Sequence, residues 1–319
     1  YFGLCIFNEL LILLIFSLLS KSSEAKDFPN KPIKIISPYG IGGTGDTIAR
    51  ALVSIAGKHV NVPLVVQPKV GGGGAVAASY IKSSPANGYN TILMTPGVLT
   101  KTFTANVPYT LDDFDAIARV VTESYILVMK YDSPWSDLKS FLEDAAKNPD
   151  KYRYTAVAAG TLNHLAAEKL MKEAGAKVTH MPYSGYDQCV MAVLRGDAEL
   201  AVVTALNAAP MVKEKKLKVV GVTNPHFMFP DAPTLTDLGY DVNWGSWRGI
   251  WVSKNTPENI QEKLLTIFKP IITDEDFISV MKNVGAVVDF IPGSQEMQTE
   301  FKMLKEAKDL AEELGFVVK

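Results

Sequence analysis

Short apolar runs alternate with amphipathic segments along most of this chain. Residues 33–37 form a β-branched run, and Ile48, Leu52 and Ile55 then recur at i, i+4 and i+7. The first pattern predicts a strand and the second a helix. Strands are also expected at 64–67, 91–95, 125–130, 152–158, 200–204 and 217–223, and helices at 75–82 and 136–147, from 162 onward, and from 186 to Gly196. This alternation is typical of parallel α/β layers.

Small residues separate the first strand from its helix. Gly40, Gly42, Gly43 and Gly45 fall within six positions. Bare N–H groups at a helix start favour an anion, and glycine lets a ligand approach the backbone closely. A comparable turn, Gly160-Thr161, precedes the helix expected from 162. We therefore expect the two turns to face each other across a cleft, with an anion held between their backbone N–H groups.

The same glycine turn also reads as G-x-G-x-x-G, the pattern of a dinucleotide-binding fold. That fold needs an acidic residue at the end of the next strand to hold the ribose. Here the strand ends in Gln67-Pro68-Lys69, without a carboxylate. The sequence therefore disfavours a nicotinamide cofactor, and we expect none.

Catalytic motifs are sparse. The sequence contains no G-x-S-x-G, H-E-x-x-H or C-x-x-C, and its four histidines lack metal-ligand spacing. His164 is interpreted as a helix-capping residue or as a general base, and Asp46 as a helix-dipole partner or a ligand contact. A secreted enzyme that acts on a carboxylate through His164 or Asp46 therefore stays open as an alternative.

Three tryptophans lie close together in the last third of the chain. Trp244, Trp247 and Trp251 fall within eight residues. This spacing is typical of core or interdomain packing. At a crossover between lobes, such residues also line the cleft.

The N-terminal segment has the pattern of an export signal. Residues 10–19 are apolar except for Ser17, and Ser23-Glu24-Ala25 fits a signal-peptidase site. The run is shorter than the about 20 residues that a membrane span needs. We predict a signal peptide over 1–25 and a periplasmic protein. An uncleaved N-terminal anchor is the alternative.

Charge and cysteine content narrow the possible partners. The chain has 32 Lys and Arg against 34 Asp and Glu, for a formal net charge of −2. This balance lacks the basic footprint of a nucleic-acid-binding protein. Removal of the leader takes Cys5 with it and leaves Cys189, so an intramolecular disulfide is excluded. Cys189 lies in an apolar helical pattern and is expected to be a buried thiol.

Several motifs occur in one order along the chain. Residues 38–50 resemble P-(F/Y)-x-P-G-G-x-x-D-x-x-A-R, and 160–165 match G-S-x-x-H-L with Thr in place of Ser. Residues 180–185 resemble H-V-P-Y-K-G, 231–235 resemble D-V-P-T-L, and 247–250 resemble W-x-G-L. Together they resemble the extracytoplasmic substrate-binding receptors of tripartite tricarboxylate transporters, also called Bug receptors.

The resemblance implies a fold and a function. The fold is α/β, two-lobed and periplasmic-binding-protein-like (type II, flytrap), with two crossover strands as the hinge. Lobe 1 would take 26–121 and 251–319, and lobe 2 would take 122–250. The receptor would bind a small organic anion (a di- or tricarboxylate, an acidic amino acid or an aromatic acid), act as a monomer and serve a two-subunit membrane permease. A receptor of this fold that serves an ATP-driven importer or a sensor kinase is the alternative.

The resemblance and the turns together define the expected ligand-binding residues. They are Tyr39, Gly42, Gly43, Asp46, Gly160, Thr161, His164, Tyr183, Asp187 and Trp247. The chain departs from the family pattern at Ile41, where proline is usual, at Ser184, where lysine is frequent, and at Ala205-Leu206, where many members have Asp-Asn. These departures leave the identity of the ligand open.

Overall fold

A computed structural model describes residues 28–40 and 44–318 of the chain. The predicted signal peptide over 1–25 and the predicted site residues Gly42 and Gly43 lie outside the described residues. The strands are β1 (Ile33–Ser37), β2 (Leu64–Pro68), β3 (Asn90–Met94), β4 (Phe114–Lys130), β5 (Arg153–Val157), β6 (Thr179–Tyr183), β7 (Leu200–Thr204), β8 (Leu217–Val222), β9 (Gly245–Ser253) and β10 (Val287–Pro292).

Helices connect most of the successive strands. They are α2 (Thr44–Ala56), α3 (Ala75–Ser83), α4 (Pro96–Leu99), α5 (Lys101–Thr104), α6 (Leu138–Lys147), α7 (Leu162–Glu173), α8 (Tyr186–Arg195), α9 (Ala205–Lys213), α10 (Glu258–Ile272), α11 (Glu275–Asn283) and α12 (Gly293–Glu313), with 3-10 turns η1 (Gly72–Gly74) and η2 (Leu111–Asp113). The elements expected from the apolar pattern are confirmed with one difference: the strand expected at 125–130 begins at Phe114. The pattern did not predict β6, β9, β10, α4, α5 or α9 to α12.

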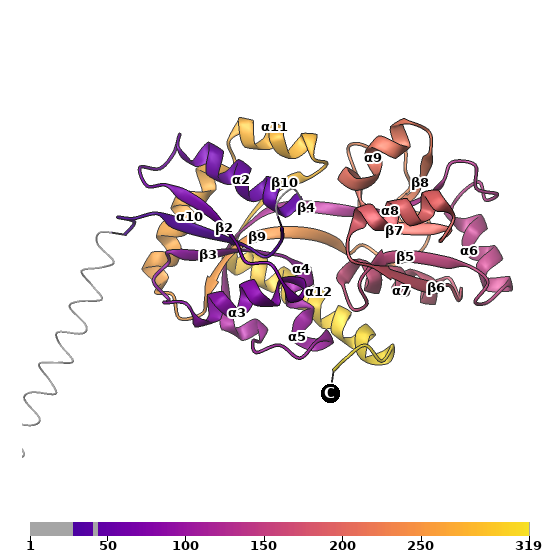
Figure 1. Cartoon of the computed structure of the whole chain (residues 1–319), viewed down its shortest axis with the longest axis horizontal. Helices are drawn as coiled ribbons and strands as arrows, with labels where there is room; N and C mark the ends of the chain where they lie inside the picture. Colours follow the sequence, from indigo (N-terminus) through magenta and orange to yellow (C-terminus); the bar gives the residue numbers. More distant parts are fainter. Residues whose placement is uncertain (1–27, 41–43, 319) are drawn as a thin grey trace, which may run out of the picture.

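The strands form two sheet regions that share β4. Within the described residues, one ten-stranded sheet has the order β2-β1-β3-β9-β4-β7-β5-β6, with β10 and β8 also paired to β4. β1, β2 and β3 are mutually parallel, as are β5, β6 and β7. The strands of each parallel group are connected through helices, as βαβ units require. Figure 1 shows the two regions as two bodies, with β4 and β9 running between them.

β4 changes partners in the middle of its length. Its residues from Phe114 to Ser124 pair antiparallel with β9, whereas Tyr125 is the first residue to pair with β7. A single 17-residue strand therefore belongs to both lobes. Together with β9 it forms the two crossover strands, and the expected two-lobed periplasmic-binding-protein fold is confirmed.

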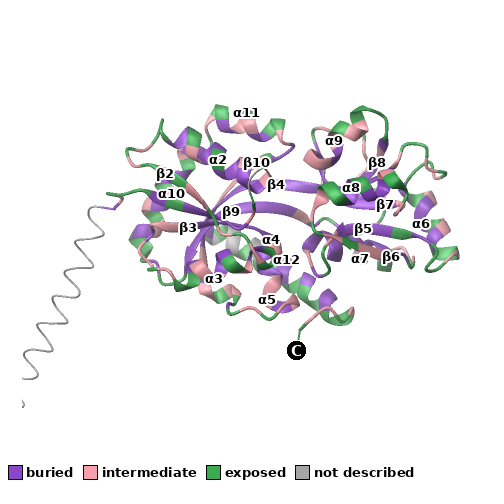
Figure 2. Cartoon of the chain, viewed as in Figure 1, coloured by how far each residue is buried: buried purple, intermediate pink, exposed green. Residues whose placement is uncertain are grey.

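Buried apolar residues explain why each element lies where it does. All five residues of β7 are buried, as the continuous apolar run 200–204 predicts for a strand covered on both faces. On α2, Ile48, Leu52 and Ile55 face the core, in agreement with their spacing. Cys189 is buried on α8, as expected. Figure 2 shows the sheet largely buried and the outer faces of the helices exposed.

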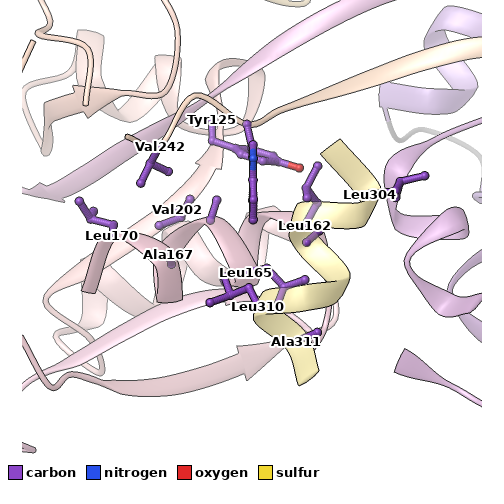
Figure 3. Packing of buried hydrophobic residues seen from close by; sticks show 14 of the residues in the cluster. Tyr125, Leu162, Leu165, Ala167, Leu170, Val202, Val242, Leu304, Leu310 and Ala311 are labelled. Atoms are coloured by element: carbon purple, nitrogen blue, oxygen red, sulfur yellow. The ribbon is translucent and has the colours of Figure 1, made fainter. Parts of the chain in front are cut away.

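The last helix packs against both lobes. α12 follows β10 in the first lobe, and its Leu310 and Ala311 belong to the same apolar cluster as Leu162 and Leu165 of α7 (Figure 3). Beyond the helix, the Val318 N–H donates to the Phe103 carbonyl over 3.1 Å. The C-terminal segment therefore contacts both sides of the hinge. No helix among the described residues is long and apolar enough to cross a membrane.

Candidate ligand-binding site

A cavity of about 270 Å³ lies between the two lobes. Its volume is below the roughly 300–1,000 Å³ of drug-sized ligand pockets, which indicates a small solute. Both lobes and both crossover strands contribute to its wall. The lining residues are Tyr39, Thr44, Gly45, Thr95 and Gly97 from the first lobe, Val157, Thr161, Leu162, Asn163, Ser184, Gly185, Tyr186, Asp187 and Asn207 from the second, and Tyr125, Ser246 and Arg248 from β4 and β9.

The first-lobe wall is built where β1 and β3 end. The Tyr39 and Thr95 hydroxyls are hydrogen-bonded at 2.8 Å, which joins the two strand ends. A Cβ at Gly45 would lie 3.1 Å from Cδ2 of Tyr39, so glycine lets the ring pack closely on the start of α2. Asp46 follows in the first turn of α2, buried, and its Oδ2 accepts from Arg50 Nε at 2.8 Å.

The second-lobe wall presents helix N-termini. Leu162 and Asn163 begin α7, and Tyr186 and Asp187 begin α8. In the described structure neither Thr161 nor Gly185 supplies a side-chain cap to its helix. The first-turn N–H groups of a helix have no intrahelical acceptor, and the helix dipole adds partial positive charge there. The cavity wall is therefore suited to an anionic group.

The turn before α7 uses its own donors internally. The Gly160 N–H donates to His164 Nδ1 at 3.2 Å, and the Thr161 N–H donates to the Ala158 carbonyl at 3.2 Å. Thr161 Oγ1 lies 2.8 Å from the Ala158 carbonyl and 2.7 Å from Asn163 Oδ1. The backbone N–H groups of residues 160 and 161, which were expected to bind the ligand, are thus hydrogen-bonded within the turn. The next residues, Leu162 and Asn163 at the start of α7, line the cavity.

The expected site residues divide into three groups. Tyr39, Thr161 and Asp187 line the cavity, and Asp187 Oδ1 accepts from Asn207 Nδ2 at 2.6 Å. Four expected residues are not part of the lining, although they neighbour lining residues along the chain or lie behind the wall: Asp46, Gly160, His164 and Tyr183. Trp247 lines a separate hollow of about 600 Å³ together with Thr122 and Ser124, on the opposite face of the crossover strands.

Sequence reasoning missed the residues contributed by the crossover strands. Tyr125, Ser246 and Arg248 line the cavity, whereas Gly245 and Trp247 line the other hollow. Alternate residues of a strand point to opposite faces. Once 245–253 is recognised as a strand, this period of two separates Arg248 from the flanking tryptophans.

A buried ion pair joins the two crossover strands beside the cavity. Arg248 Nη1 contacts Glu123 Oε2 and also donates to Ser246 Oγ at 3.1 Å. Arg248 and Glu123 are 6% and 2% exposed. Burial lowers the pKa of the Arg248 guanidinium to about 10, which still leaves it protonated at neutral pH. The site therefore includes a permanent cation held by a carboxylate.

A cluster of buried rings lies behind the second-lobe wall. His164 and His180 have ring centroids 4.1 Å apart, and Tyr154 stacks on His180 at 5.0 Å. His164 Nε2 lies 3.6 Å from Glu168 Oε1, whose carboxyl also accepts from the Tyr154 hydroxyl. Burial lowers the pKa of His164 to about 3 and lowers that of His180, so both rings are neutral at pH 7.

These histidines are expected to make the protein less stable in mild acid. Between pH about 6.5 and 3 the unfolded chain binds a proton at residue 164 that the folded chain excludes. Each such group lowers the free energy of unfolding by up to about 1.4 kcal/mol per pH unit as the pH falls. Burial raises the pKa of Glu168, and this acts in the opposite direction. Urea unfolding at pH 7 and 5.5 measures the difference.

A matched variant isolates the contribution of His164. Asparagine at this position keeps an acceptor for the Gly160 N–H and does not titrate. His164→Asn is expected to reduce the loss of stability between pH 7 and 5.5 by roughly one histidine's share. An equal pH dependence in the variant and the wild type would contradict the assignment of His164 as a buried neutral histidine.

Across residues 28–40 and 44–318, no group of three or more His, Cys, Asp or Glu side chains is arranged to hold a metal ion. The polar groups that line the cavity are hydroxyls, amides, one carboxylate and one guanidinium.

Comparison with known proteins identifies the family. Residues 48–316 match the family model described as the tripartite tricarboxylate transporter family receptor, and the chain belongs to this family. A protein from the tcbD-tcbE intergenic region of Pseudomonas sp. is 27% identical over 274 residues, covering 83% of this chain and 81% of its own. Protein BugT of Bordetella pertussis is 25% identical over 244 residues, covering 74% and 75%.

Solved structures share the fold over nearly the whole chain. A TctC solute-binding protein from Polaromonas has a TM-score of 0.78 at 26% identity, covering 90% of this chain and 99% of its own. MatC of Rhodopseudomonas palustris, with bound malate, has a TM-score of 0.75 at 22% identity, covering 89% and 99%. A second R. palustris protein, with adipate, has a TM-score of 0.80 at 21% identity, covering 92% and 99%. The chain is thus a solute-binding receptor of the tripartite tricarboxylate family.

Proposed function

We propose that this receptor captures a small organic carboxylate in the cavity between its lobes and delivers it to a two-subunit membrane permease. One observation carries the proposal: the N-termini of α7 and α8 and the guanidinium of Arg248 line the same small cavity. Each of these features stabilises a negative charge on a bound solute. Malate and adipate in two proteins of the same fold support an organic acid as the ligand.

The same geometry supports binding without covalent chemistry. His164, the candidate general base, is absent from the cavity lining, and burial lowers its pKa to about 3. Asp46, the other candidate, is paired with Arg50. Neither group is placed to exchange a proton with a solute in the cavity. These observations favour a receptor over a secreted enzyme.

The setting of the receptor is proposed from the family and the sequence. We place the protein in the periplasm as a monomer, exported by the leader over 1–25. We propose the lobe division 26–121 and 251–319 against 122–250, and the strand order, in which β4 and β9 are neighbours, supports these two strands as the hinge. A permease of the tripartite type is proposed as the partner, rather than an ATP-driven importer or a sensor kinase, because the chain belongs to the tripartite tricarboxylate receptor family.

Ligand binding is expected to make the protein more compact. Walls from both lobes contact one cavity, so a solute that bridges them stabilises the closed arrangement of the two lobes. A screen of di- and tricarboxylates, acidic amino acids and aromatic acids by thermal shift identifies a ligand, and calorimetry measures its affinity. Small-angle scattering with and without saturating ligand should then show a decrease in the radius of gyration.

Two controls make the scattering experiment decisive. Calorimetry must first show that the acid binds, and the acid must be recovered chemically unchanged after incubation, which separates a receptor from an enzyme. An unchanged radius of gyration with an acid that calorimetry shows to bind would contradict the closure mechanism. Conversion of the acid during incubation would contradict the assignment as a receptor.

A further inference from the structure

Arg248 is the one cation among the residues that line the described cavity. It lies on β9 opposite Val121 of β4, in the crossover that joins the lobes. Ser246 and Tyr125 line the cavity beside it. The side chain is held by the sheet rather than by a mobile loop, so its position is fixed before a ligand arrives.

The guanidinium uses only part of its donor capacity on the protein. Nη1 contacts Glu123 and donates to Ser246 Oγ at 3.1 Å. Nε is buried and has no hydrogen-bond partner in the described structure. A buried donor without a partner is costly, and such groups in native proteins call for an explanation. A ligand that accepts a hydrogen bond from this nitrogen would supply it.

Glu123 offsets part of the charge of Arg248 but does not line the cavity, so a solute meets the guanidinium donors and not the carboxylate. Arginine presents its donors in a rigid planar fork that suits a carboxylate. Asp187, the one carboxylate in the lining, is exposed and bonded to Asn207, at the end of the cavity formed by α8.

The cavity thus has two positions for negative charge. The first is the N-terminal turns of α7 and α8, and the second is the Arg248 side chain on β9. We propose, on the basis of the proposed function, that Arg248 determines specificity: its Nε edge binds the second acid group of a ligand whose first acid group lies at α7 and α8. The receptor therefore selects diacids over monoacids of the same length.

The test compares diacids with monoacids in wild-type and variant protein. Calorimetry measures succinate against butyrate, glutarate against pentanoate, and adipate against hexanoate. The variant is Glu123→Gln/Arg248→Gln, which removes both buried charges together and so avoids leaving either one unpaired. Loss of a charge-assisted hydrogen bond should weaken diacid binding roughly ten- to hundredfold and change monoacid binding by less than about threefold.

A second double variant controls for the loss of a buried arginine as such. Arg119 on β4 is buried, contacts Asp289 at 3.0 Å, and lines the hollow on the opposite face of the crossover strands. Arg119→Gln/Asp289→Asn removes an arginine–carboxylate pair, in which the Asp289 side chain is 35% exposed, without touching the cavity. It should leave the preference for diacids unchanged, and circular dichroism checks that both double variants are folded.

The outcomes separate this inference from the proposed function. Selectivity lost in the Glu123/Arg248 variant and kept in the Arg119/Asp289 variant supports the role of Arg248. Selectivity kept in both variants overturns it, as does a wild-type protein that binds the monoacids as tightly as the diacids. In these last two cases the protein still binds carboxylates, so the proposed function stands. A wild-type protein that binds none of the six acids also overturns the inference, and one that binds no acid of the wider screen contradicts the proposed function itself.

Discussion

Glu123→Gln is expected to lower the free energy of unfolding by about 3–5 kcal/mol at pH 7. The substitution keeps the shape of the side chain and removes the carboxylate that pairs with Arg248. Because both side chains are almost fully buried, the remaining guanidinium would be left in the interior without its counter-charge. Urea or guanidinium unfolding, followed by circular dichroism, measures the loss.

An exposed ion pair provides the control. Lys172 Nζ and Glu313 Oε2 lie 2.6 Å apart on α7 and α12, with side chains 51% and 56% exposed. Glu313→Gln is expected to cost less than about 1 kcal/mol, because water already solvates both charges. Similar losses for the two variants would mean that the Glu123–Arg248 pair is not buried as described. Adding Arg248→Gln to Glu123→Gln should recover most of the stability.

Gly97→Leu is expected to abolish tight ligand binding while leaving the fold intact. Gly97 is the second residue of α4 and lines the cavity. A Cβ there would lie 3.5 Å from the Tyr39 hydroxyl, an ordinary contact, and the rest of the leucine would extend among the cavity walls. A solute that loses two charge-assisted hydrogen bonds by displacement binds at least roughly a hundredfold more weakly.

Gly57→Leu is the matched control for this substitution. Gly57 is exposed at the end of α2, and no atom lies within 4 Å of the Cβ that a side chain would add. Calorimetry with the acid found by screening should give wild-type affinity for Gly57→Leu and no measurable affinity for Gly97→Leu. Thermal unfolding should be similar for both. Wild-type affinity in Gly97→Leu would place the ligand outside this cavity.

The local pattern of the sequence predicted most of the individual elements. The spacing of Ile48, Leu52 and Ile55 predicted α2, and the run from Leu200 to Thr204 predicted β7. These signals are local, because an element buries one face or all of its residues against the core. The order of motifs then predicted the two-lobed fold, which local periodicity alone leaves undetermined.

The first half of β4 was missed because charged residues interrupt its apolar pattern. Asp115, Arg119 and Glu123 occupy positions that an isolated strand would fill with apolar side chains. Each is paired by a residue far along the chain: Lys254 contacts Asp115, Asp289 contacts Arg119, and Arg248 contacts Glu123. Such partners are set by the tertiary fold, and the local sequence carries no signal for them.

The expected site residues and the cavity lining overlap in part. Tyr39, Thr161 and Asp187 line the cavity, because residues at the ends of strands and the starts of helices meet in a cleft of this fold. The structure engages the Gly160 N–H with His164, a contact that residue types alone do not specify. Arg248 was not among the expected ligand-binding residues, whereas its neighbour Trp247 was expected and lines the other hollow.

The position of β9 beside β3 also determines when the first lobe can form during synthesis. β3 pairs with β1 on one edge and with β9 on the other, and β9 leaves the ribosome only after the whole of the second lobe. Until β9 has been synthesised, β3 lacks the partner for its second edge. Pairings between distant segments form slowly, and unpaired edges favour aggregation. The order of the strands along the chain therefore makes completion of the first lobe wait for the second.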